Sequence, residues 1–232
     1  MITERLRSML RRPGASLSPG PSVIVPANHS SAATLFDREV VTSRQSRGLE
    51  QFFAYVRGQV GLSILDFAGA SQENINFITN LGHRLYSEDF VRSLDDVFGD
   101  EDPNDQANQG LIDQFLRQML NFEKDQFDGV LVWDVLQYLT PPLLTATLEK
   151  LSTIVRPQGY LLAYFHADEK ARQVPFYSFR IKDQQSLVLA QRGTRQPAQI
   201  FNNRSLEKLF QRFESVKFFL TREQLREVIV RR

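Results

Sequence analysis

The sequence contains no cysteine, a single tryptophan and almost no net charge, at +1 over 232 residues. The lack of cysteine excludes a disulfide scaffold, a thiolate nucleophile and a cysteine-based zinc site. The balanced charge gives no overall field that would draw the chain to nucleic acid or to an acidic membrane. No apolar run approaches the length of a membrane-spanning helix, and the start of the chain lacks the apolar region of a secretory signal. We therefore expect a cytoplasmic protein that neither spans a membrane nor binds nucleic acid.

The sequence does contain enough apolar material for one ordinary domain, since 42% of its residues are hydrophobic and 24% are charged. Residues 1–33 differ from the rest, with prolines among serines and small residues, as in a linker. The first dozen residues form a basic arm that could contact a membrane surface or a partner. A solvated tail is the alternative that we expect. We predict a flexible segment over residues 1–33 and one domain over residues 34–232.

Strands and helices alternate through the middle of the chain. Apolar spacing and capping residues predict helices over 46–59, 73–81 and from 141, and strands over 63–67, 84–87, 127–133 and 160–165. The acidic stretch 94–110 does not match a calcium loop and reads as a solvated loop. Residues 111–120 read as helical, with an end that could add a strand. Alternation of this kind predicts a mostly parallel sheet covered by helices on both faces, a three-layer α/β sandwich.

The last third of the chain has a different pattern. Residues 177–192 predict a hairpin with its turn at 182–185, which we treat as an insertion at about 176–192. The chain ends with two predicted strands, 216–222 and 226–232. Their link is too short for a parallel crossover, so they must be antiparallel neighbours.

Two stretches together resemble a known family. ILDFAGASQENINFITNLGHRLYSED resembles the cofactor-binding half of class I S-adenosylmethionine-dependent methyltransferases, and FDGVLVWDVLQYLTPPLLTATLEKLSTIVRPQGYLLAYF resembles their fourth and fifth strands with the helix between them. The resemblance covers residues 46–232. It implies a Rossmann-like sheet of about seven strands, mostly parallel with one antiparallel C-terminal strand. It also implies S-adenosylmethionine as the cofactor.

The turn after the first strand departs from the family's glycine pattern. The family sequence Asp-Leu-Gly-Cys-Gly-Thr-Gly falls on residues 66–72, where Asp66 is kept and alanine or glutamine stands at the family's glycine positions. Glycine suits such a turn because the backbone approaches the ligand closely or needs positive φ. The resemblance implies cofactor contacts from Asp66, Ala68, Gly69 and Ala70.

Other cofactor contacts are implied further along the chain. The family's ribose-binding acid falls on Asp89, with Glu88 as the neighbouring alternative. The spacing from Asp66 also suits ribose recognition in related α/β sheets. Asn121 and Phe122 resemble the segment that flanks the adenine. Trp133 could pack on the cofactor, and a core position is the alternative.

The chemistry of methyl transfer requires mainly alignment of the acceptor, because the sulfonium leaving group is already activated. A base helps when the acceptor must lose a proton. His166 is the best catalytic candidate by type and place, with a structural role as the alternative. Tyr138, after the strand at 127–133, and Tyr164, near the end of the strand at 160–165, are candidates for substrate binding. No pattern of metal ligands is visible.

Three functions remain open from the sequence. The leading one is an S-adenosylmethionine-dependent methyltransferase acting on a small-molecule acceptor. The second is a catalytically inactive protein of the same fold that serves as a binding or partner subunit, which the altered glycine turn favours. A dinucleotide oxidoreductase comes third, because Gly-x-Gly-x-x-Gly is absent.

Overall fold

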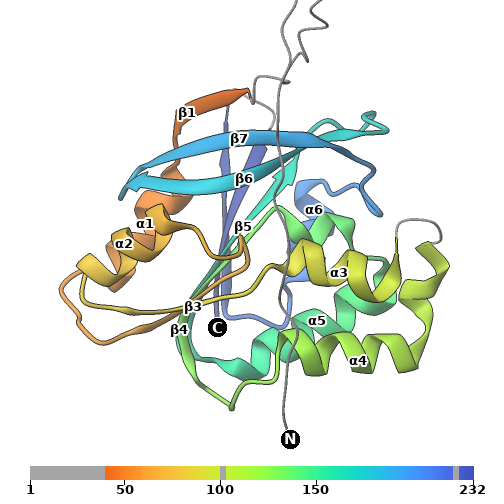
Figure 1. Ribbon diagram of the computed structural model, residues 1–232, viewed down its shortest axis with the longest axis horizontal. Helices are drawn as coiled ribbons and strands as arrows, with labels where there is room; N and C mark the ends of the chain where they lie inside the picture. The colour runs from red at the N-terminus through yellow and green to blue at the C-terminus, as the bar shows by residue number, and fades with distance from the viewer. Residues whose placement is uncertain (1–39, 100–102, 222–224) are drawn as a thin grey trace, which may run out of the picture. The chain divides into compact units, whose positions relative to one another are not determined.

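Two sheets organise the part of the chain that the computed structural model describes, residues 40–99, 103–221 and 225–232. The larger sheet has six strands and the smaller has three (Figure 1). The predicted flexible segment 1–33, with its basic arm, lies outside the described residues. None of the described helices has both the length and the apolar character that crossing a bilayer requires.

The six-stranded sheet has the order β3-β2-β4-β5-β9-β8. Its strands are β2 (Ser63–Asp66), β3 (Arg84–Ser87), β4 (Phe127–Trp133), β5 (Val155–His166), β8 (Ser215–Leu220) and β9 (Leu225–Arg231). The first four strands in this order run parallel, and β9 is antiparallel to both of its neighbours. The predicted mostly parallel sheet with one antiparallel C-terminal strand is confirmed.

The sheet has six strands rather than about seven, because the segment that could have added a strand is wholly helical. Helix α4 (Gln109–Met119) begins at Asn108, whose side chain accepts hydrogen bonds from the first backbone amides of the helix. Its buried residues Ile112, Phe115 and Met119 recur at helical spacing. They pack with α3 and α5, which leaves β3 as the edge strand.

The acidic stretch 94–110 is not the loop that we predicted. The first residues of the stretch belong to helix α3 (Phe90–Phe98), and later residues form a 3₁₀ helix, η1 (Pro103–Ala107). The apolar residues Phe90, Leu94 and Phe98 recur every four positions and are buried, while the acidic side chains occupy the other face. The charge of the stretch concealed this apolar periodicity.

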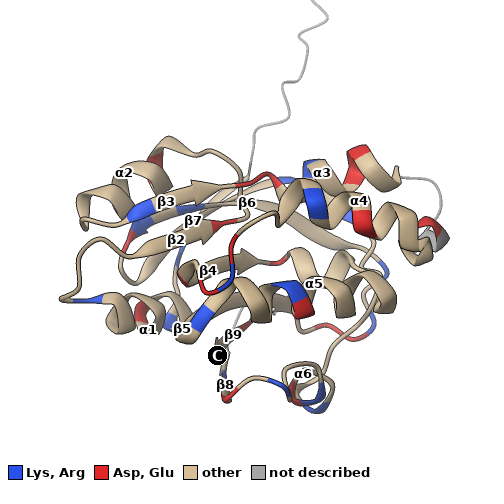
Figure 2. Cartoon of the chain, turned by 90° about the horizontal axis from the view of Figure 1, so that it is seen from below, with Lys and Arg blue, Asp and Glu red and all other residues tan. Residues whose placement is uncertain are grey.

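Helices cover both faces of the large sheet. Helices α1 (Arg47–Val56) and α2 (Gln72–Asn80) lie on one side, and α3, α4, α5 (Pro141–Ile154) and α6 (Asn203–Leu209) lie on the other (Figures 1 and 2). A short 3₁₀ helix, η2 (Val135–Tyr138), follows β4. Basic and acidic residues are interspersed over this surface (Figure 2), as the balanced composition predicts. The three-layer arrangement matches the expected fold class.

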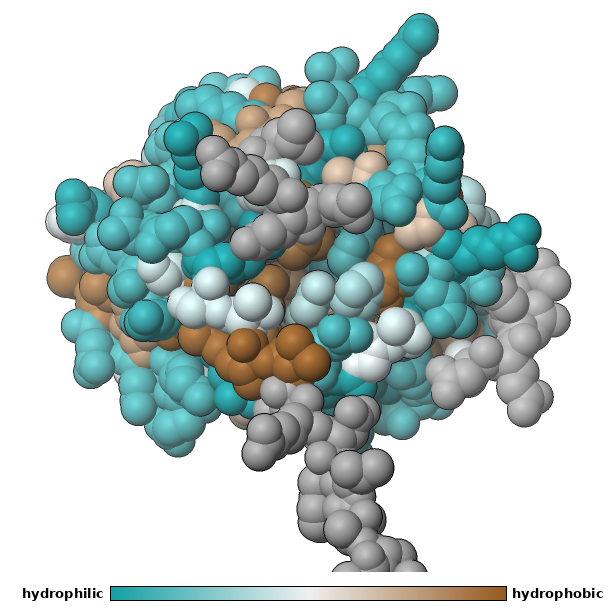
Figure 3. All heavy atoms as spheres, turned by 90° about the horizontal axis from the view of Figure 1, so that it is seen from above, coloured by the Kyte–Doolittle hydropathy of each residue, from teal (hydrophilic) through white to brown (hydrophobic). Residues whose placement is uncertain are grey.

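The predicted hairpin is β6 (Val174–Asp183) with β7 (Ser186–Arg195), and its turn lies at 184–185 within the predicted range. A further strand, β1 (Val41–Gln45), pairs with β7 and completes a separate three-stranded sheet. Apolar residues of the hairpin are buried against the rest of the domain, namely Phe179, Ile181, Leu187 and Leu189. The surface on the β1–β7–β6 side is mainly hydrophilic, with apolar patches between (Figure 3). The small sheet therefore has a defined inner face.

Candidate active site

The carboxyl ends of the parallel strands bring several of the predicted site residues to one edge of the sheet. Asp66 ends β2, Trp133 ends β4 and His166 ends β5. Asp89 follows β3 by two residues and precedes α3. Ligands of open α/β sheets bind at this edge, so we take it as the candidate active site.

Asp66 is fully buried, and protein groups engage both oxygens of its carboxyl group. Oδ1 accepts hydrogen bonds from Trp133 Nε1 at 2.5 Å and from the amide of Ala68 at 2.9 Å. Oδ2 accepts one from Asn74 Nδ2 at 2.8 Å. Burial raises the pKa of Asp66 to about 6, although these hydrogen bonds act in the opposite direction. Asp66 therefore links the end of β4, the turn after β2 and the start of α2 through buried hydrogen bonds.

The turn after β2 has alanine at two of the family's glycine positions, and neither alanine needs a positive φ. Gly69 has φ +78°, whereas Ala68, Ala70 and Gln72 are not among the described residues with positive φ. Gln72 is already the first residue of α2, which Ser71 caps. Within residues 66–72, only Gly69, which falls at the family's cysteine position, therefore occupies the left-handed region that disfavours a Cβ.

The turn lies directly against the end of β3. The amide of Gly69 donates to the carbonyl of Glu88 at 3.1 Å. A Cβ on Gly69 would lie 3.3 Å from Cβ of Asp89, which is a second reason for glycine at this position. The two loops that would flank a ribose are thus joined to each other.

Asp89 lines a cavity together with Ala68 and Trp133, as expected of residues that contact one cofactor. Its side chain also caps α3, because Oδ1 accepts a hydrogen bond from the amide of Arg92 at 3.1 Å. The ribose-binding role of Asp89 stays a prediction. Burial raises the pKa of the alternative acid, Glu88.

The cavity at this edge measures only about 20 Å³. Its walls come from the loops after β2, β3 and β4 and from the β6–β7 hairpin, which contributes Phe176, Tyr177, Ser178, Phe179 and Arg192. A volume of this size holds about one water molecule, whereas small-molecule sites measure roughly 300–1,000 Å³. S-adenosylmethionine does not fit the site in this arrangement, because the hairpin fills the space.

Two residues that the sequence analysis did not select fasten the hairpin to the site. The ring of Phe179 stacks on Trp133 with centroids 4.9 Å apart and an interplanar angle of 16°. Asn74, in the first turn of α2, is fully buried and hydrogen bonds the hairpin backbone on both sides of Arg180. An asparagine that bonds the backbone of a strand more than 100 residues away gives no recognisable local signal, so these contacts could not be found from the sequence.

The two candidate substrate-binding tyrosines are engaged elsewhere. Tyr138 is buried, and its hydroxyl donates to Asp134 Oδ2 at 3.1 Å. Tyr164 is also buried, with its hydroxyl 2.6 Å from Ser46 Oγ. Neither lines the cavity, so contact with a substrate stays a prediction for both.

Asp134, which follows Trp133, was not predicted as a site residue. Its pKa is nevertheless shifted further from its ordinary value than that of Asp66. Asp134 lines the cavity and is almost fully buried. Burial raises its pKa to about 7, partly opposed by the hydrogen bond from Tyr138 and by the charge of Arg195. An acid with this pKa changes its charge near neutral pH.

The predicted adenine-flanking residues do not reach the cavity. Phe122 packs edge-to-face on Tyr86 and on Phe127, the first residue of β4. Asn121 is exposed. Their predicted cofactor contact is untested, but in this arrangement neither residue borders the space beside Asp89.

His166 is held by a backbone carbonyl. Its Nε2 lies 3.1 Å from the oxygen of Pro175, and because a carbonyl can only accept, Nε2 carries the proton. The ring also stacks on Tyr177 at 6.2 Å. Burial lowers the pKa of His166 to about 4, so the imidazole is neutral at pH 7. This geometry gives His166 a structural task at the junction of β5 and β6, and its catalytic role stays a prediction.

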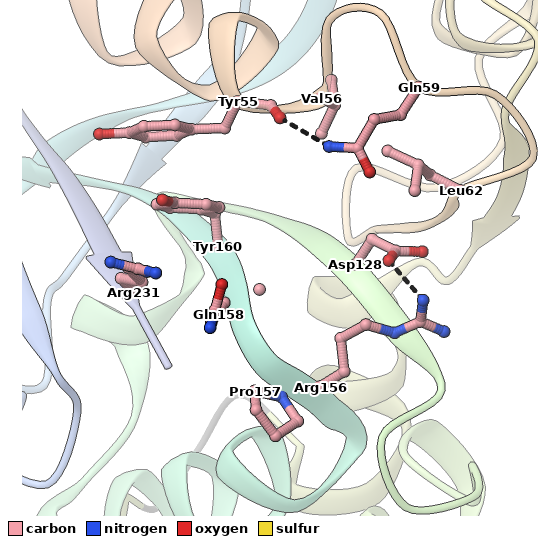
Figure 4. A pocket seen from close by; sticks show the side chains of 11 residues that line it. Tyr55, Val56, Gln59, Leu62, Asp128, Arg156, Pro157, Gln158, Tyr160 and Arg231 are labelled. Atoms are coloured by element: carbon pink, nitrogen blue, oxygen red, sulfur yellow. Dashed lines mark hydrogen bonds and ion pairs between the residues drawn. The ribbon is translucent and has the colours of Figure 1, made fainter.

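A larger cavity, of about 400 Å³, lies at the opposite edge of the large sheet (Figure 4). Its walls include the stacked rings of Tyr55 and Tyr160 and the ion pair between Arg156 and Asp128. These residues lie near the starts of β4 and β5, away from the edge where ligands of this architecture bind. No group of His, Asp or Glu residues suited to a metal ion occurs in the described ranges.

Comparison with solved structures found similar folds at low sequence identity. The 1,6-didemethyltoxoflavin-N1-methyltransferase of Burkholderia thailandensis, crystallised with 1,6-didemethyltoxoflavin and S-adenosylhomocysteine, is 13% identical. It has a TM-score of 0.47 and a match that covers 80% of this chain and 76% of that chain. An S-adenosylmethionine-dependent methyltransferase from Archaeoglobus fulgidus is 14% identical with a TM-score of 0.46, over 79% of this chain and 91% of that chain.

Comparison with curated sequences and with protein families identifies the family of this chain. No curated protein sequence matches the chain significantly. Residues 38–214, by contrast, match the family described as a methyltransferase domain. That match includes both stretches that resemble the class I enzymes, whose cofactor is S-adenosylmethionine. The chain therefore belongs to the S-adenosylmethionine-dependent methyltransferase domain family.

Proposed function

We propose that this protein is an S-adenosylmethionine-dependent methyltransferase that acts on a small-molecule acceptor. The observation that carries the proposal is the convergence of Ala68, Asp89 and Trp133 on one cavity at the carboxyl edge of the sheet. Three separate segments of the sequence supply these residues, and the family resemblance selects each of them as a cofactor contact. Membership of the methyltransferase domain family supports the same reaction class.

A small acceptor is supported by the cover over the site. The β6–β7 hairpin lies over the edge where the predicted cofactor contacts converge, so a cofactor and its acceptor would both have to be accommodated between the strand ends and the hairpin. Basic and acidic residues are interspersed along the described part of the chain in Figure 2, which does not favour a nucleic acid as the acceptor. An acceptor that can be enclosed under a hairpin is a small molecule rather than a macromolecule.

Calorimetric titration with S-adenosylmethionine and S-adenosylhomocysteine tests the proposal. Asp89→Asn is the informative variant, because asparagine caps a helix as well as aspartate does but removes the charge that would accept from ribose hydroxyls. We expect Asp89→Asn to weaken binding by roughly tenfold or more, since a charge-assisted hydrogen bond contributes about 1.5–3 kcal/mol. Glu88→Gln is the matched control. An effect in Glu88→Gln alone would transfer the ribose-binding role to that acid.

A second candidate function is a cofactor-free subunit that binds a partner through the same fold. The observation that favours it is the complete engagement of the Asp66 carboxyl group and of Asn74 by protein groups. A site retired from cofactor binding would be filled in this way. Absence of binding by either ligand, in wild-type protein and in variants that open the site, would support this candidate.

A further inference from the structure

The β6–β7 hairpin and the predicted cofactor contacts lie on the same cavity. Ala68, Asp89 and Trp133 form one side of it, and the hairpin residues 176–179 form the other. The hairpin comes from a part of the chain more than 40 residues beyond Trp133 in sequence. The space between strand ends and hairpin is therefore created, and nearly closed, by tertiary packing.

Phe179 fills the centre of this contact. Its side chain is 2% exposed and contacts two aromatic rings of the large sheet, which also contact each other. The Phe179 ring stacks on Trp133 at 4.9 Å and contacts Tyr164 at 5.4 Å, tilted by 39°. A planar ring is thus stacked on the tryptophan at the end of β4, which is one of the predicted cofactor contacts.

Asn74 fixes the hairpin backbone beside that ring. Its Nδ2 donates to the carbonyl of Phe179 at 3.2 Å and to Asp66 Oδ2 at 2.8 Å, and its Oδ1 accepts from the amide of Ile181 at 2.7 Å. Asn74 stands in the first turn of α2, directly after the turn at 66–71. The segment that holds a cofactor in the family therefore holds the hairpin here.

The ring contact of Phe179 and the hydrogen bonds of Asn74 could be replaced by contacts with a ligand of similar free energy. Hydrogen bonds between neutral groups contribute only about 0.5–1.5 kcal/mol net, because the released groups bond to water or to a ligand instead. If the Phe179 ring moves away from Trp133, a bound purine could stack on Trp133 in its place. The ends of the hairpin have separate attachments, from Ser46 N to the carbonyl of Gln185 at 2.8 Å and from Arg195 to Asp95 at 2.5 Å. These attachments involve neither Phe179 nor Asn74, so they do not depend on the stacking of Phe179 on Trp133.

We infer that the β6–β7 hairpin is an autoinhibitory element that competes with the cofactor for the carboxyl edge of the sheet, with Phe179 as the competing group and Asn74 as its fastening. This inference rests on the proposed function. Binding of S-adenosylmethionine then requires withdrawal of Phe179 from Trp133. The apparent affinity is lowered by the fraction of molecules in which the hairpin is closed.

The test measures binding of S-adenosylhomocysteine by calorimetry and follows the emission of Trp133, the only tryptophan of the chain. The variants are Phe179→Ala, which removes the competing ring, and Asn74→Ser, which removes the carboxamide that bonds the hairpin backbone. Lys182→Ala, an exposed position on the same strand, is the control. Phe179→Leu replaces Phe179→Ala if circular dichroism shows that the alanine variant does not fold.

We expect Phe179→Ala to bind S-adenosylhomocysteine at least about tenfold more tightly than wild type, with Asn74→Ser between them and Lys182→Ala unchanged. Binding to the wild type should shift the Trp133 emission to longer wavelength, because its stacked ring leaves. Equal affinity in all four proteins, with unchanged emission, would overturn the inference and leave the proposed function standing. Absence of binding in every folded variant would overturn both.

Discussion

The indole nitrogen of Trp133 donates a hydrogen bond of 2.5 Å to Oδ1 of Asp66, which joins the ends of β4 and β2 inside the protein. Trp133 has φ +56°, an uncommon conformation for a bulky residue. That backbone conformation accompanies the placement of the indole between the Asp66 carboxyl group and the ring of Phe179. The end of β4, at the edge where the family binds its cofactor, is thus joined to buried Asp66 by a hydrogen bond and to the hairpin by the stacking of Phe179.

Trp133→Phe should destabilise the protein more at pH 8 than at pH 5. Phenylalanine keeps an aromatic face but loses the donor to Asp66, whose pKa of about 6 in the folded chain leaves it ionised only at the higher pH. We expect a loss of roughly 1.5–3 kcal/mol in the free energy of unfolding at pH 8. Urea denaturation of Trp133→Phe, Asp66→Asn and the double variant measures the coupling. Additive effects would show that the hydrogen bond contributes nothing.

Asp134→Asn should stabilise the protein at alkaline pH and have little effect at acid pH. Asp134 keeps its proton up to about pH 7 when folded, but only up to its ordinary value of 3.8 when unfolded. Wild-type stability therefore falls as the pH rises between these values, by at most about 4 kcal/mol. Asparagine cannot ionise and still accepts from Tyr138. Melting temperatures at pH 5 and pH 8 test this, with exposed Asp113→Asn as control. A stabilisation independent of pH would contradict the buried carboxyl as its cause.

His166 should not titrate between pH 5.5 and 8. Its folded pKa of about 4 lies below its ordinary value of 6.5, so the unfolded chain takes up a proton first as the pH falls. The stability that His166 contributes is present above pH 6.5 and is lost as the pH falls toward 4. Imidazole resonances followed by NMR, assigned with His166→Gln, report the titration directly. A midpoint near 6.5 would restore His166 as a candidate base.

Glu227→Ala should cost about 3–5 kcal/mol of unfolding free energy, because it leaves the charge of Arg44 buried. Glu227 Oε1 lies 3.1 Å from Arg44 Nη2, and its Oε2 accepts from the amide of Gly48 at 2.6 Å. The side chains are 3% and 0% exposed, and the pair joins β1 to β9. Chemical denaturation should show almost no effect of Glu149→Ala, whose ion pair with Arg212 is exposed. Similar costs for the two variants would contradict burial as the deciding factor.

The sequence by itself determined the order and type of most elements. Apolar periodicity and the proline that opens α5 are local signals, and they place most strands and helices of the large sheet correctly. The short link between β8 and β9 fixes their antiparallel pairing for a purely geometric reason. Asp66 and Asp89 were brought to the same edge of the sheet because each follows a parallel strand.

Only the tertiary structure decided what covers that edge. Asn74 and the hairpin residues whose backbone it bonds are separated by 105 residues or more in the sequence. No sequence periodicity relates positions so far apart. Local patterns specify which residues share a face of one element. They do not specify which element packs against that face, because that choice depends on shape and hydrogen bonding between surfaces formed only after folding. The altered glycine turn predicted a change at this edge of the sheet, and only the tertiary structure shows that Phe179 of the hairpin stacks on Trp133 there.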